Sequence, residues 1–587
     1  MDIFSILSLI GGLVLFLYGM DLMGDSLKKL AGGKLESILA KLTSNRFKGF
    51  LLGFIVTAVI QSSSATTVML VGFVNSGIMK LGQTISIIMG ANIGTTVTSW
   101  LLSTAGIDGT GSIIMKLLKP ESFTPVLAVI GFIMIAMAKN DKKRHTGHIL
   151  IGFAILMFGM ETMGASVEAL KDNATFTNLL TMFSNNPVMG ILVGTVFTAI
   201  IQSSSASVGV LQALSLSCIV PYSTAIPVVL GMNIGTTITP IISSISGNTD
   251  SKRVALSCLY IKMVGVAIVA GIFYALNAFV GFEFLETRAS AFNIAVVHTL
   301  FNIVSTIILL PFCSVIEKLA LKTVKSKKDE EEADVFAVLD ERFLAMPSFA
   351  VEKAKDLVCE MANISSEAFL IATELLHKFD TSAFEKVDKL ESKVDKYEDK
   401  ISTYLVKLAE YEVAGNDSRI VTELLHCIGD IERISDHALN IAEVAEEIHD
   451  KKIDFSEKAK ADIKIITDAV SEVLGIAISS LVNDDLDAAR RVEPLEQVID
   501  RLKRKIKNGH ITRLRQGDCT MELGFILSDL LTSYERIADH CSNIAVCFLE
   551  MAHNSFETHE YLNNLKSGEE EGFREMYEQY KAKYYME

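Results

Sequence analysis

The chain has 587 residues and a formal net charge of −15, with 54 Lys and Arg against 69 Asp and Glu. At this length two or more domains are expected, and an acidic excess that lies mostly after residue 322 argues against nucleic acid as a partner. The eight cysteines show no CxxC spacing, which argues against a disulfide framework and against a zinc site.

The composition changes abruptly near residue 322. Before this point the sequence is apolar, rich in Gly and sparsely charged, whereas Lys, Asp and Glu are dense after it. The first part therefore predicts a membrane domain over 1–320. Its first apolar stretch lacks the basic start and cleavage motif of a signal peptide, so we expect a retained helix. Runs long enough to span a bilayer lie at 3–24, 82–104, 122–138, 146–165, 222–246, 255–280 and 290–316.

A polar segment, QSSSA, occurs twice within this apolar part, at Gln61–Ala65 and Gln202–Ala206. The apolar arms on either side have about 14 or 15 residues, so as helices they are roughly 22 Å long. This is too short to cross a hydrocarbon core of about 30 Å. We therefore predict two re-entrant hairpins with QSSS at their tips, formed by 47–60 with 65–79 and by 188–201 with 207–220.

A second polar segment follows each QSSSA at an equal distance, as GANIGTT at Gly90–Thr96 and GMNIGTT at Gly231–Thr237. Polar groups in hydrocarbon cost several kcal/mol each unless they are satisfied. Duplicated polar breaks in apolar helices are typical of a secondary transporter whose site lies between two structural repeats. The alternative is that Ser, Thr and Gly only allow close helix packing, which the equal spacing of the copies disfavours.

The similarity between the two copies extends beyond these motifs, since Gly19–Asp21 resembles Gly159–Glu161. One unit comprises a span, a hairpin and two further spans. Three crossings are an odd number, so the second unit must enter with inverted topology. We predict an all-α polytopic membrane protein with inverted repeats at about 5–140 and 146–280, and a final span at 290–316. The hairpins then enter from opposite sides, and their tips can meet near the midplane.

Loop charges orient this topology. Four groups of Lys and Arg fall on one side, which the positive-inside rule makes cytoplasmic. The N-terminus is then outside and the domain after residue 322 is inside. The four groups are Lys28, Lys29, Lys34, Lys41, Arg46 and Lys48; Lys139, Lys142, Lys143 and Arg144; Lys252 and Arg253; and Lys318, Lys322, Lys325, Lys327 and Lys328.

The chemistry of the two tips suits an anion together with sodium. A helix that restarts within QSSS points its first N–H groups and the positive end of its dipole at the tip. Broken-helix carbonyls, with Gln, Asn and Thr oxygens, suit Na⁺. Neither hairpin core contains Arg, Lys, Asp or Glu, so we expect co-bound cations to neutralise the anion.

These paired motifs, with Ala295–Asn302 in the last span, resemble the bacterial branch of the type II sodium/phosphate cotransporter family over about residues 5–315. The resemblance implies that inorganic phosphate moves with Na⁺ across a bacterial inner membrane. The two halves differ, because Ser207 and Val208 stand where the first copy has Thr66 and Thr67. By motif match, the implied substrate and ion residues are Gln61, Ser62, Ser63, Ser64, Thr66, Asn92, Thr95, Thr96, Gln202, Ser203, Ser204, Ser205, Asn233, Thr236 and Thr237.

Residues 345–555 contain a second duplication, in which Asp430–His437 followed by Asn440–Ala442 recurs as Tyr534–His540 followed by Asn543–Ala545. This pattern resembles the PhoU family, which consists of two three-helix bundles and is associated with control of phosphate transport and signalling. Its ExxxD motifs can bind metal clusters. Two interpretations stay open, a site for a divalent metal, iron or zinc, and a solvated acidic face. The candidate ligands are Glu391, Asp395, Glu432, Asp436, Glu496, Asp500, Glu535 and Asp539.

The remaining segments carry little chemistry. Residues 321–344 are predicted to be a solvated linker, and 556–587 a charged tail. His298 and Asn302 share one helical face, which we interpret as a packing hydrogen bond, with a proton or substrate contact as the alternative. No P-loop and no nucleophile–base constellation is present, so neither ATP-driven transport nor an enzyme is expected.

Beyond phosphate and lipid, the expected partners are a second copy of the chain or a phosphate-signalling protein. Three other functions stay open: transport of a related oxyanion, phosphate export, and a membrane sensor that binds phosphate and signals through its soluble domain. Duplicated hairpins favour transport over sensing, because alternating access needs two symmetric gates.

Overall fold

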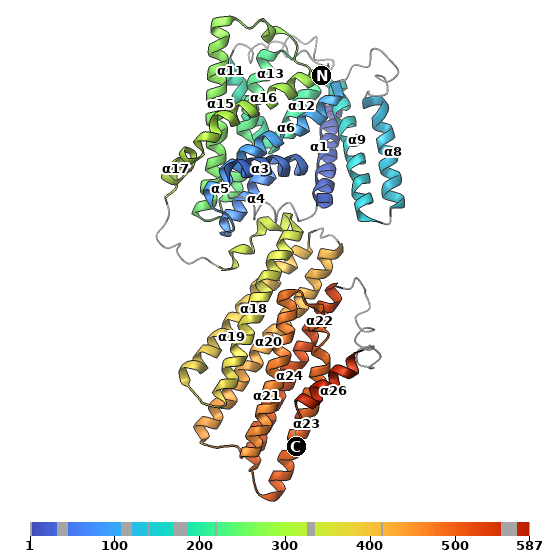
Figure 1. Cartoon of the computed structure of the whole chain (residues 1–587). Helices are drawn as coiled ribbons and strands as arrows, with labels where there is room; N and C mark the ends of the chain where they lie inside the picture. Colours follow the sequence, from blue (N-terminus) through green and yellow to red (C-terminus); the bar gives the residue numbers. More distant parts are fainter. Residues whose placement is uncertain are drawn as a thin grey trace. The chain divides into compact units, whose positions relative to one another are not determined.

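The computed structural model describes residues 3–31, 45–106, 120–138, 140–167, 186–217, 220–325, 335–411, 415–552 and 572–585. The chain divides into two compact units, Met1–Met346 and Pro347–Glu587 (Figure 1). Within the described ranges the units are helical, and the only β pairing there is an isolated bridge between Pro221 and Arg288. Lys34, Lys41, Lys139, Lys327 and Lys328, used above for orientation, lie outside these ranges.

The first unit contains four helix pairs interrupted at the polar motifs, together with longer continuous helices. Its helices are α1 (Ile3–Ala31), α3 (Arg46–Ile60), α4 (Ser63–Asn75), α5 (Leu81–Gly94), α6 (Thr96–Ser103), α8 (Pro120–Met137), α9 (Asp141–Val167), α11 (Pro187–Ile201), α12 (Ser204–Ser217), α13 (Tyr222–Gly235), α14 (Ile238–Ser244), α15 (Thr249–Val280), α16 (Ala291–Leu309) and α17 (Cys313–Thr323). Short 3₁₀ turns are η1 (Thr104–Gly106), η3 (Glu283–Glu286), η4 (Leu310–Phe312), η5 (Val335–Val338) and η6 (Glu341–Ala345).

Six of the seven predicted spans fall on helices that are long and apolar enough to cross a membrane. The exception, 122–138, corresponds to a shorter apolar helix. Two predicted spans, 82–104 and 222–246, are interrupted at their GTT segments, because α5 ends at Gly94 and α13 at Gly235. One further helix of suitable length and hydropathy, α21 (Glu457–Asn483), lies in the second unit, where it contacts α23 and α24.

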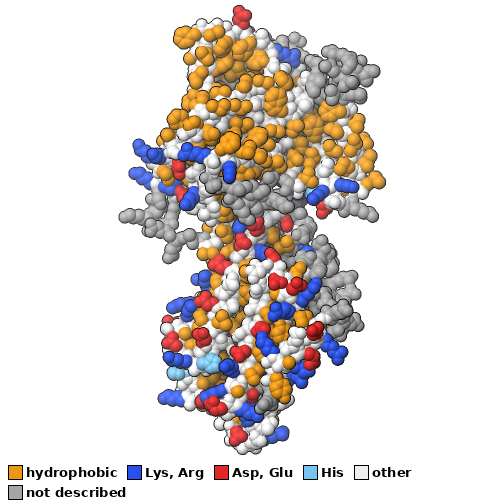
Figure 2. Space-filling model, viewed as in Figure 1, with side chains coloured by type: hydrophobic (Ala, Val, Ile, Leu, Met, Phe, Trp, Pro, Cys, Tyr) orange, Lys and Arg blue, Asp and Glu red, His pale blue; other side chains and the backbone are white. Residues whose placement is uncertain are grey.

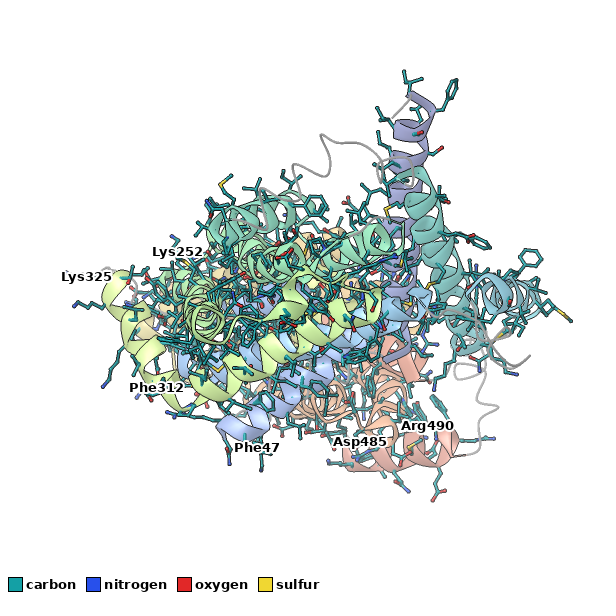
Figure 3. All side chains as sticks on the ribbon, turned by 90° about the horizontal axis from the view of Figure 1, so that it is seen from above. Phe47, Lys252, Phe312, Lys325, Asp485 and Arg490 are labelled. Carbon is teal, nitrogen blue, oxygen red and sulfur yellow. The ribbon has the colours of Figure 1, made fainter. Side chains whose placement is uncertain are left out.

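The face of the first unit seen in Figure 2 is largely apolar. Its exposed side chains include Phe4 and Val14 of α1, Phe132 of α8 and Phe279 of α15. Lys and Arg gather mainly at one end of this unit (Figure 2). Figure 3 places Lys252 and Lys325 at one edge, where Arg253 Nε donates to the Val324 carbonyl at 2.9 Å. An apolar belt that ends in a basic rim is typical of a membrane protein.

The helices that begin the two repeats pack against each other through glycines. Seen from above, α1 and α9 run side by side with α8 beyond them (Figure 3). A Cβ on Gly19 would approach the Leu156 backbone nitrogen to 2.4 Å, and one on Gly159 would approach that of Phe16 to the same distance. The two segments whose sequences are alike therefore make equivalent contacts on each other.

Each QSSS motif lies at the break between two short helices, where the sequence predicted a break. The first helix of each pair begins at an equivalent asparagine cap, where Asn45 Oδ1 accepts from Phe47 N at 2.9 Å and Asn186 Oδ1 accepts from Val188 N at 3.2 Å. The second helices reach into the opposite repeat, since α4 contacts α14 and α12 contacts α6. This interlocking brings the two motifs close together.

The predicted linker is wrong in its second half. Turns η5 and η6 belong to the first unit, which ends at Met346 rather than at 320. Phe343 is fully buried, with its ring centroid 5.5 Å from that of Phe73 on α4. Asp340 Oδ2 accepts a hydrogen bond from Asn75 Nδ2 at 2.7 Å. The linker was predicted from the charged residues 327–332. The buried aromatic side chain of Phe343 instead holds residues 335–346 against the first unit.

The second unit contains two three-helix bundles, as predicted. The first is formed by α18 (Pro347–Leu375), α19 (Thr381–Ala409) and α20 (Gly415–Lys451), and the second by α21 (Glu457–Asn483), α23 (Val492–Gln516) and α24 (Met521–Ala552), with a short α22 (Leu486–Ala489). Helices α20 and α24 join the bundles. There Asp430 Oδ1 lies 2.7 Å from His540 Nδ1 and accepts from Asn543 Nδ2 at 3.1 Å.

Part of the predicted charged tail is a helix, α26 (Phe573–Lys583), that packs on α23. The Tyr580 hydroxyl accepts from Arg491 Nε at 3.2 Å. Lys583 Nζ lies 2.7 Å from the Glu472 carboxylate on α21. These contacts attach the end of the chain to the second three-helix bundle.

Candidate functional site

The two tips have the same local geometry. Gln61 and Gln202 end the first helix of each pair with φ of 58° and 61°. These values lie in the left-handed region, which residues other than Gly rarely adopt. Their backbone N–H groups donate to the Thr57 and Thr198 carbonyls at 2.7 Å. Such a conformation costs on the order of 1–3 kcal/mol and persists only where the surrounding structure enforces it, often at functional sites. The break at each motif is therefore a built feature of both repeats.

The first serine of each motif caps the helix that follows. Ser62 Oγ accepts from Ala65 N at 3.1 Å, and Ser203 Oγ accepts from Ala206 N at 3.2 Å. Each hydroxyl satisfies one N–H at its helix start and keeps its own hydrogen for another acceptor. Helices α4 and α12 thus begin at the tips with the positive ends of their dipoles.

The two tips meet. Ser64 Oγ of the first motif lies 3.5 Å from the Gln202 carbonyl oxygen of the second, at the outer limit of a hydrogen bond. Ser63, Ser204 and Ser205 are buried, whereas Ser62, Ser64 and Ser203 are partly exposed. The side-chain oxygen of Gln61 is buried without a hydrogen-bond partner among the described residues. Two segments 141 residues apart in sequence therefore share one polar region.

The GxNIGTT segments combine close packing with buried hydroxyl and amide groups. A Cβ on Gly90 would lie 1.9 Å from the Phe50 carbonyl oxygen, and one on Gly231 would lie 2.0 Å from that of Ile191. The glycines thus allow α5 to pack closely against α3, and α13 against α11. For these glycines, the interpretation that small residues serve close helix packing therefore holds. The threonine hydroxyls donate within their own segments, Thr95 to the Ala91 carbonyl at 3.0 Å and Thr236 to that of Asn233 at 2.7 Å. Each hydroxyl oxygen can also accept a hydrogen bond or contact a cation through its lone pairs.

Other candidate residues of these segments also hydrogen-bond carbonyls of their own helices. Thr96 and Thr237 donate to the carbonyls three residues earlier, at 2.7 and 2.8 Å. Asn233 Nδ2 donates to the Val229 carbonyl at 2.9 Å, and Asn92 is buried. Thr66 of the first tip contacts Thr57 at 2.9 Å. These residues are thus held by local contacts at or near the helix breaks, while their roles toward substrate and ions remain predictions.

The last span contacts the first repeat through His298. Its Nδ1 lies 2.8 Å from Ser99 Oγ on α6, and Asn302 Nδ2 donates to the His298 carbonyl at 2.8 Å. The predicted packing hydrogen bond is therefore present. His298 Nε2 is buried without a partner among the described residues.

One charged residue near these segments was not among the residues predicted from the sequence. Lys262 of α15 is buried, and its Nζ donates to Thr236 Oγ1 at 2.5 Å. The hairpin cores are uncharged as noted, but a helix distant in sequence places an ammonium group beside the second GTT segment. The available signal was a single lysine within the apolar run 255–280.

In the second unit, one of the two candidate carboxylate sets is clustered. Carboxylate oxygens of Glu391, Asp395 and Asp436 lie within 4.8 Å of one another, a spacing that suits a metal ion. Burial raises the pKa of Glu432 to about 7, with further contributions from Asp436 and Asp395. Burial and the neighbouring carboxylates also raise the pKa of Asp436 and of Glu391. Mutual repulsion of this kind is relieved when a cation binds.

Three carboxylates of the equivalent set in the second bundle lie beside basic side chains. Glu535 pairs with Lys503, Asp500 lies 3.7 Å from Arg504, and Asp539 lies 3.7 Å from Arg536. An additional metal cation gains less where lysine and arginine already supply positive charge. The ligand role of Glu496, Asp500, Glu535 and Asp539 remains a prediction, and the geometry favours the first set.

A metal at the first set should make the chain more heat-stable, and Asp436→Asn should remove that effect. In the folded full-length protein, Zn²⁺ or Mn²⁺ is expected to raise the melting temperature of the second unit. The increase should be larger at pH 8 than at pH 5.5, because carboxylates with raised pKa must lose protons before they bind metal. Asp539→Asn serves as the matched control and should keep the effect. Equal metal responses in both variants would contradict the assignment.

Comparisons with known proteins agree with this architecture. A family model described as "Na+/Pi-cotransporter" matches residues 15–165 and again 155–287, and one described as "PhoU domain" matches 358–445 and 463–547. The chain belongs to the Na+/Pi-cotransporter family and carries a PhoU domain. Each model matches twice, in accord with the two internal duplications. The PhoU match contains most of α21, which assigns this apolar helix to the bundle.

Relatives of this cotransporter-family protein cover the whole chain or one of its parts. "Putative inorganic phosphate export protein YjbB" of Salmonella typhimurium is 22% identical over 95% of this chain and 100% of its own length. "Phosphate-specific transport system accessory protein PhoU homolog 1" of Thermotoga maritima is 28% identical over 39% of this chain and 95% of its own. "Sodium-dependent phosphate transport protein 2A" of Rattus norvegicus is 38% identical over 16% of this chain and 15% of its own. A crystal structure of PhoU from Pseudomonas aeruginosa aligns with 35% of this chain and 97% of that chain, at 21% identity and a TM-score of 0.33.

Proposed function

We propose that this protein is a sodium-coupled carrier of inorganic phosphate, in which the two QSSS tips line one central site. The observation that carries the proposal is the contact between Ser64 and the Gln202 carbonyl, which brings equivalent segments of the two repeats together. Family membership supports phosphate as the substrate. The PhoU domain then regulates transport rather than forming the path.

The chemistry of the tips supports an anion site. Helices α4 and α12 begin there, so their first N–H groups and the positive ends of their dipoles favour a negative charge. Partly exposed Ser62, Ser64 and Ser203 add hydroxyl donors. The helix breaks at Thr95 and Thr236 supply carbonyl and hydroxyl oxygens of the kind that coordinate Na⁺ in broken-helix transporters.

The proposed mechanism is alternating access by two inverted repeats. Two re-entrant hairpins that enter from opposite sides would act as alternating gates around a fixed site, with one repeat moving against the other. The interlocked contacts of α4 with α14 and of α12 with α6 would couple the two gates. Phosphate would be occluded between the tips together with its sodium ions.

Export is the second candidate for the physiological direction. Relatives that match nearly the whole chain are named for inorganic phosphate export. A coupled carrier works in either direction, and the ion and phosphate gradients decide which one prevails. The same site and residues would serve both directions.

Sodium should be required for tight phosphate binding. When choline replaces Na⁺, we expect the phosphate dissociation constant of the purified protein to rise at least about tenfold, which corresponds to about 1.4 kcal/mol. The reason is that the N–H and hydroxyl donors at the tips supply only partial charges to a dianion. Calorimetry in the two salts measures the change.

Proteoliposomes test transport and its direction together. A sodium gradient imposed in either direction should drive phosphate along it, and collapse of the gradient should stop net movement. Phosphate that binds equally in sodium and choline, or that never crosses the bilayer, would contradict the proposal. Binding without flux would instead favour a sensor, and flux of sulfate or arsenate in preference to phosphate would identify another oxyanion.

A further inference from the structure

One lysine lies deep inside the first unit. Lys262 is the fourteenth of the 32 residues of α15, about 20 Å along a helix of about 48 Å. Its side chain is 6% exposed. Helix α15 contacts α4, α5, α13, α14 and α16, so elements of both repeats surround it. An ionisable residue at such depth is costly and typically marks an ion or substrate pathway.

The Lys262 ammonium binds at a helix break. Its Nζ donates to Thr236 Oγ1 at 2.5 Å, while the same hydroxyl donates to the Asn233 carbonyl at 2.7 Å. Thr236 caps the C-terminal end of α13. Backbone carbonyls and the negative end of the helix dipole favour a cation at such an end. The lysine therefore occupies a position suited to a positive ion.

No carboxylate of the described ranges pairs with this ammonium. Its electrostatic neighbours are the Cys258 thiol, one turn away on α15, and the His298 imidazole. His298 itself has a buried Nε2 without a partner in the described structure. An uncompensated charge and an unpartnered nitrogen in one buried region indicate that a ligand completes the site, and an anion would balance the charge.

The lysine also connects the second repeat with the first tip. The Cys258 thiol lies near the Thr67 side chain of α4. Thr67 Oγ1 in turn donates to the carbonyl of Ser63, within the first QSSS motif, at 2.8 Å. One face of α15 thus contacts the first tip through Cys258 and the second GTT segment through Lys262.

The equivalent position of the first repeat differs. Thr95 occupies the place of Thr236 and caps the C-terminal end of α5. Its hydroxyl donates to the Ala91 carbonyl at 3.0 Å, and no lysine or arginine within the described ranges donates to it. The two repeats therefore offer the same oxygens at the same helix ends, but only the second has a fixed ammonium beside them.

We propose that Lys262 is a built-in cation of the transport site, which holds the cation position of the second repeat in place of one sodium ion and balances one charge of the bound phosphate. This inference rests on the proposed function. It makes the protein couple one sodium ion fewer per phosphate than its duplicated motifs alone would suggest. Removal of the ammonium frees the Thr236 position for Na⁺.

The test measures how phosphate affinity depends on sodium in the purified full-length protein. The slope of log affinity for inorganic phosphate against log Na⁺ concentration counts the sodium ions taken up with phosphate. Lys262→Met should raise this slope by about one and lower phosphate affinity about tenfold or more at low sodium, with recovery at high sodium. In proteoliposomes the net charge moved per phosphate should also rise by about one positive charge, for the same reason. Lys252→Met, at the exposed start of the same helix, should change neither quantity.

Each outcome decides the matter. An unchanged slope in Lys262→Met overturns the inference, even if affinity falls, because sodium then does not take the vacated position. If Lys262→Met fails to fold, as judged by size-exclusion chromatography and thermal melting, Lys262→Gln keeps a donor for Thr236 without the charge and is held to the same two readouts. If the unaltered protein binds phosphate without any sodium dependence, the proposed function itself fails, whatever the variants show.

Discussion

Leucine at the partly exposed tip serines is expected to abolish phosphate transport while leaving the protein folded. Ser64→Leu and Ser203→Leu each place an apolar side chain where the two motifs meet. We expect the initial rate to fall on the order of a hundredfold or more, because even small misplacements of a binding group have effects of this size. Ser203→Leu also removes a helix cap, which costs about 1 kcal/mol of stability. Radioactive phosphate uptake into proteoliposomes gives the rate, and thermal melting reports the fold.

Ser76→Leu is the matched control for this prediction. Ser76 is a partly exposed serine at the opposite end of the same helix α4, where its hydroxyl donates to the Gly72 carbonyl at 2.9 Å. It is expected to keep most of the transport rate. Near-normal uptake by either well-folded tip variant would show that the tips do not share the transport site, and equal losses in all three variants would show a nonspecific effect of leucine.

A chain that ends at Met346 should fold and carry phosphate, whereas one that ends at Lys325 should be much less stable. Both keep every polar motif of the membrane unit, but only the longer one keeps Phe343. Loss of a buried phenylalanine side chain costs about 3–5 kcal/mol, and the hydrogen bond between Asp340 and Asn75 is lost with it. Thermal melting of both truncated proteins in one detergent measures the difference, and proteoliposome uptake measures transport.

Two point variants distinguish the loss of the Phe343 side chain from the shortening of the chain as the cause of instability. Phe343→Ala in the 1–346 protein should reproduce most of the instability, whereas Val335→Ala, at a side chain that is 44% exposed, should not. Equal melting of the two truncated chains would mean that the segment is only a connector. A folded 1–346 protein that carries no phosphate would place the PhoU domain within the transport machinery.

Phe343 joins the last segment of the first unit to helix α4. It contacts Gly72 and Phe73 of α4, the helix that begins at the first QSSS motif. A Cβ on Gly72 would approach the Phe343 ring to 2.8 Å, so the contact is close-packed. Helix α18, the first helix of the second unit, begins at Pro347, four residues after Phe343.

The local features of the site were readable from sequence because they depend on residues near one another in the chain. The helix breaks at Gln61 and Gln202, the caps at Ser62 and Ser203, and the glycine positions follow from short motifs whose hydrogen bonds span three or four residues. Their duplication at one offset then indicated two repeats. The carboxylate motifs of the second unit were found in the same way.

Tertiary structure alone decided which of these groups act together. The contact of Ser64 with Gln202, the bond from Lys262 to Thr236 and the burial of Phe343 each join segments far apart in sequence. Likewise, three carboxylates of one bundle cluster together, while those of the other lie beside lysine and arginine. Such contacts depend on how whole helices pack and on which face each one presents. A motif records the local hydrogen bonds of its own residues, but it does not record the distant side chain that packing brings beside it.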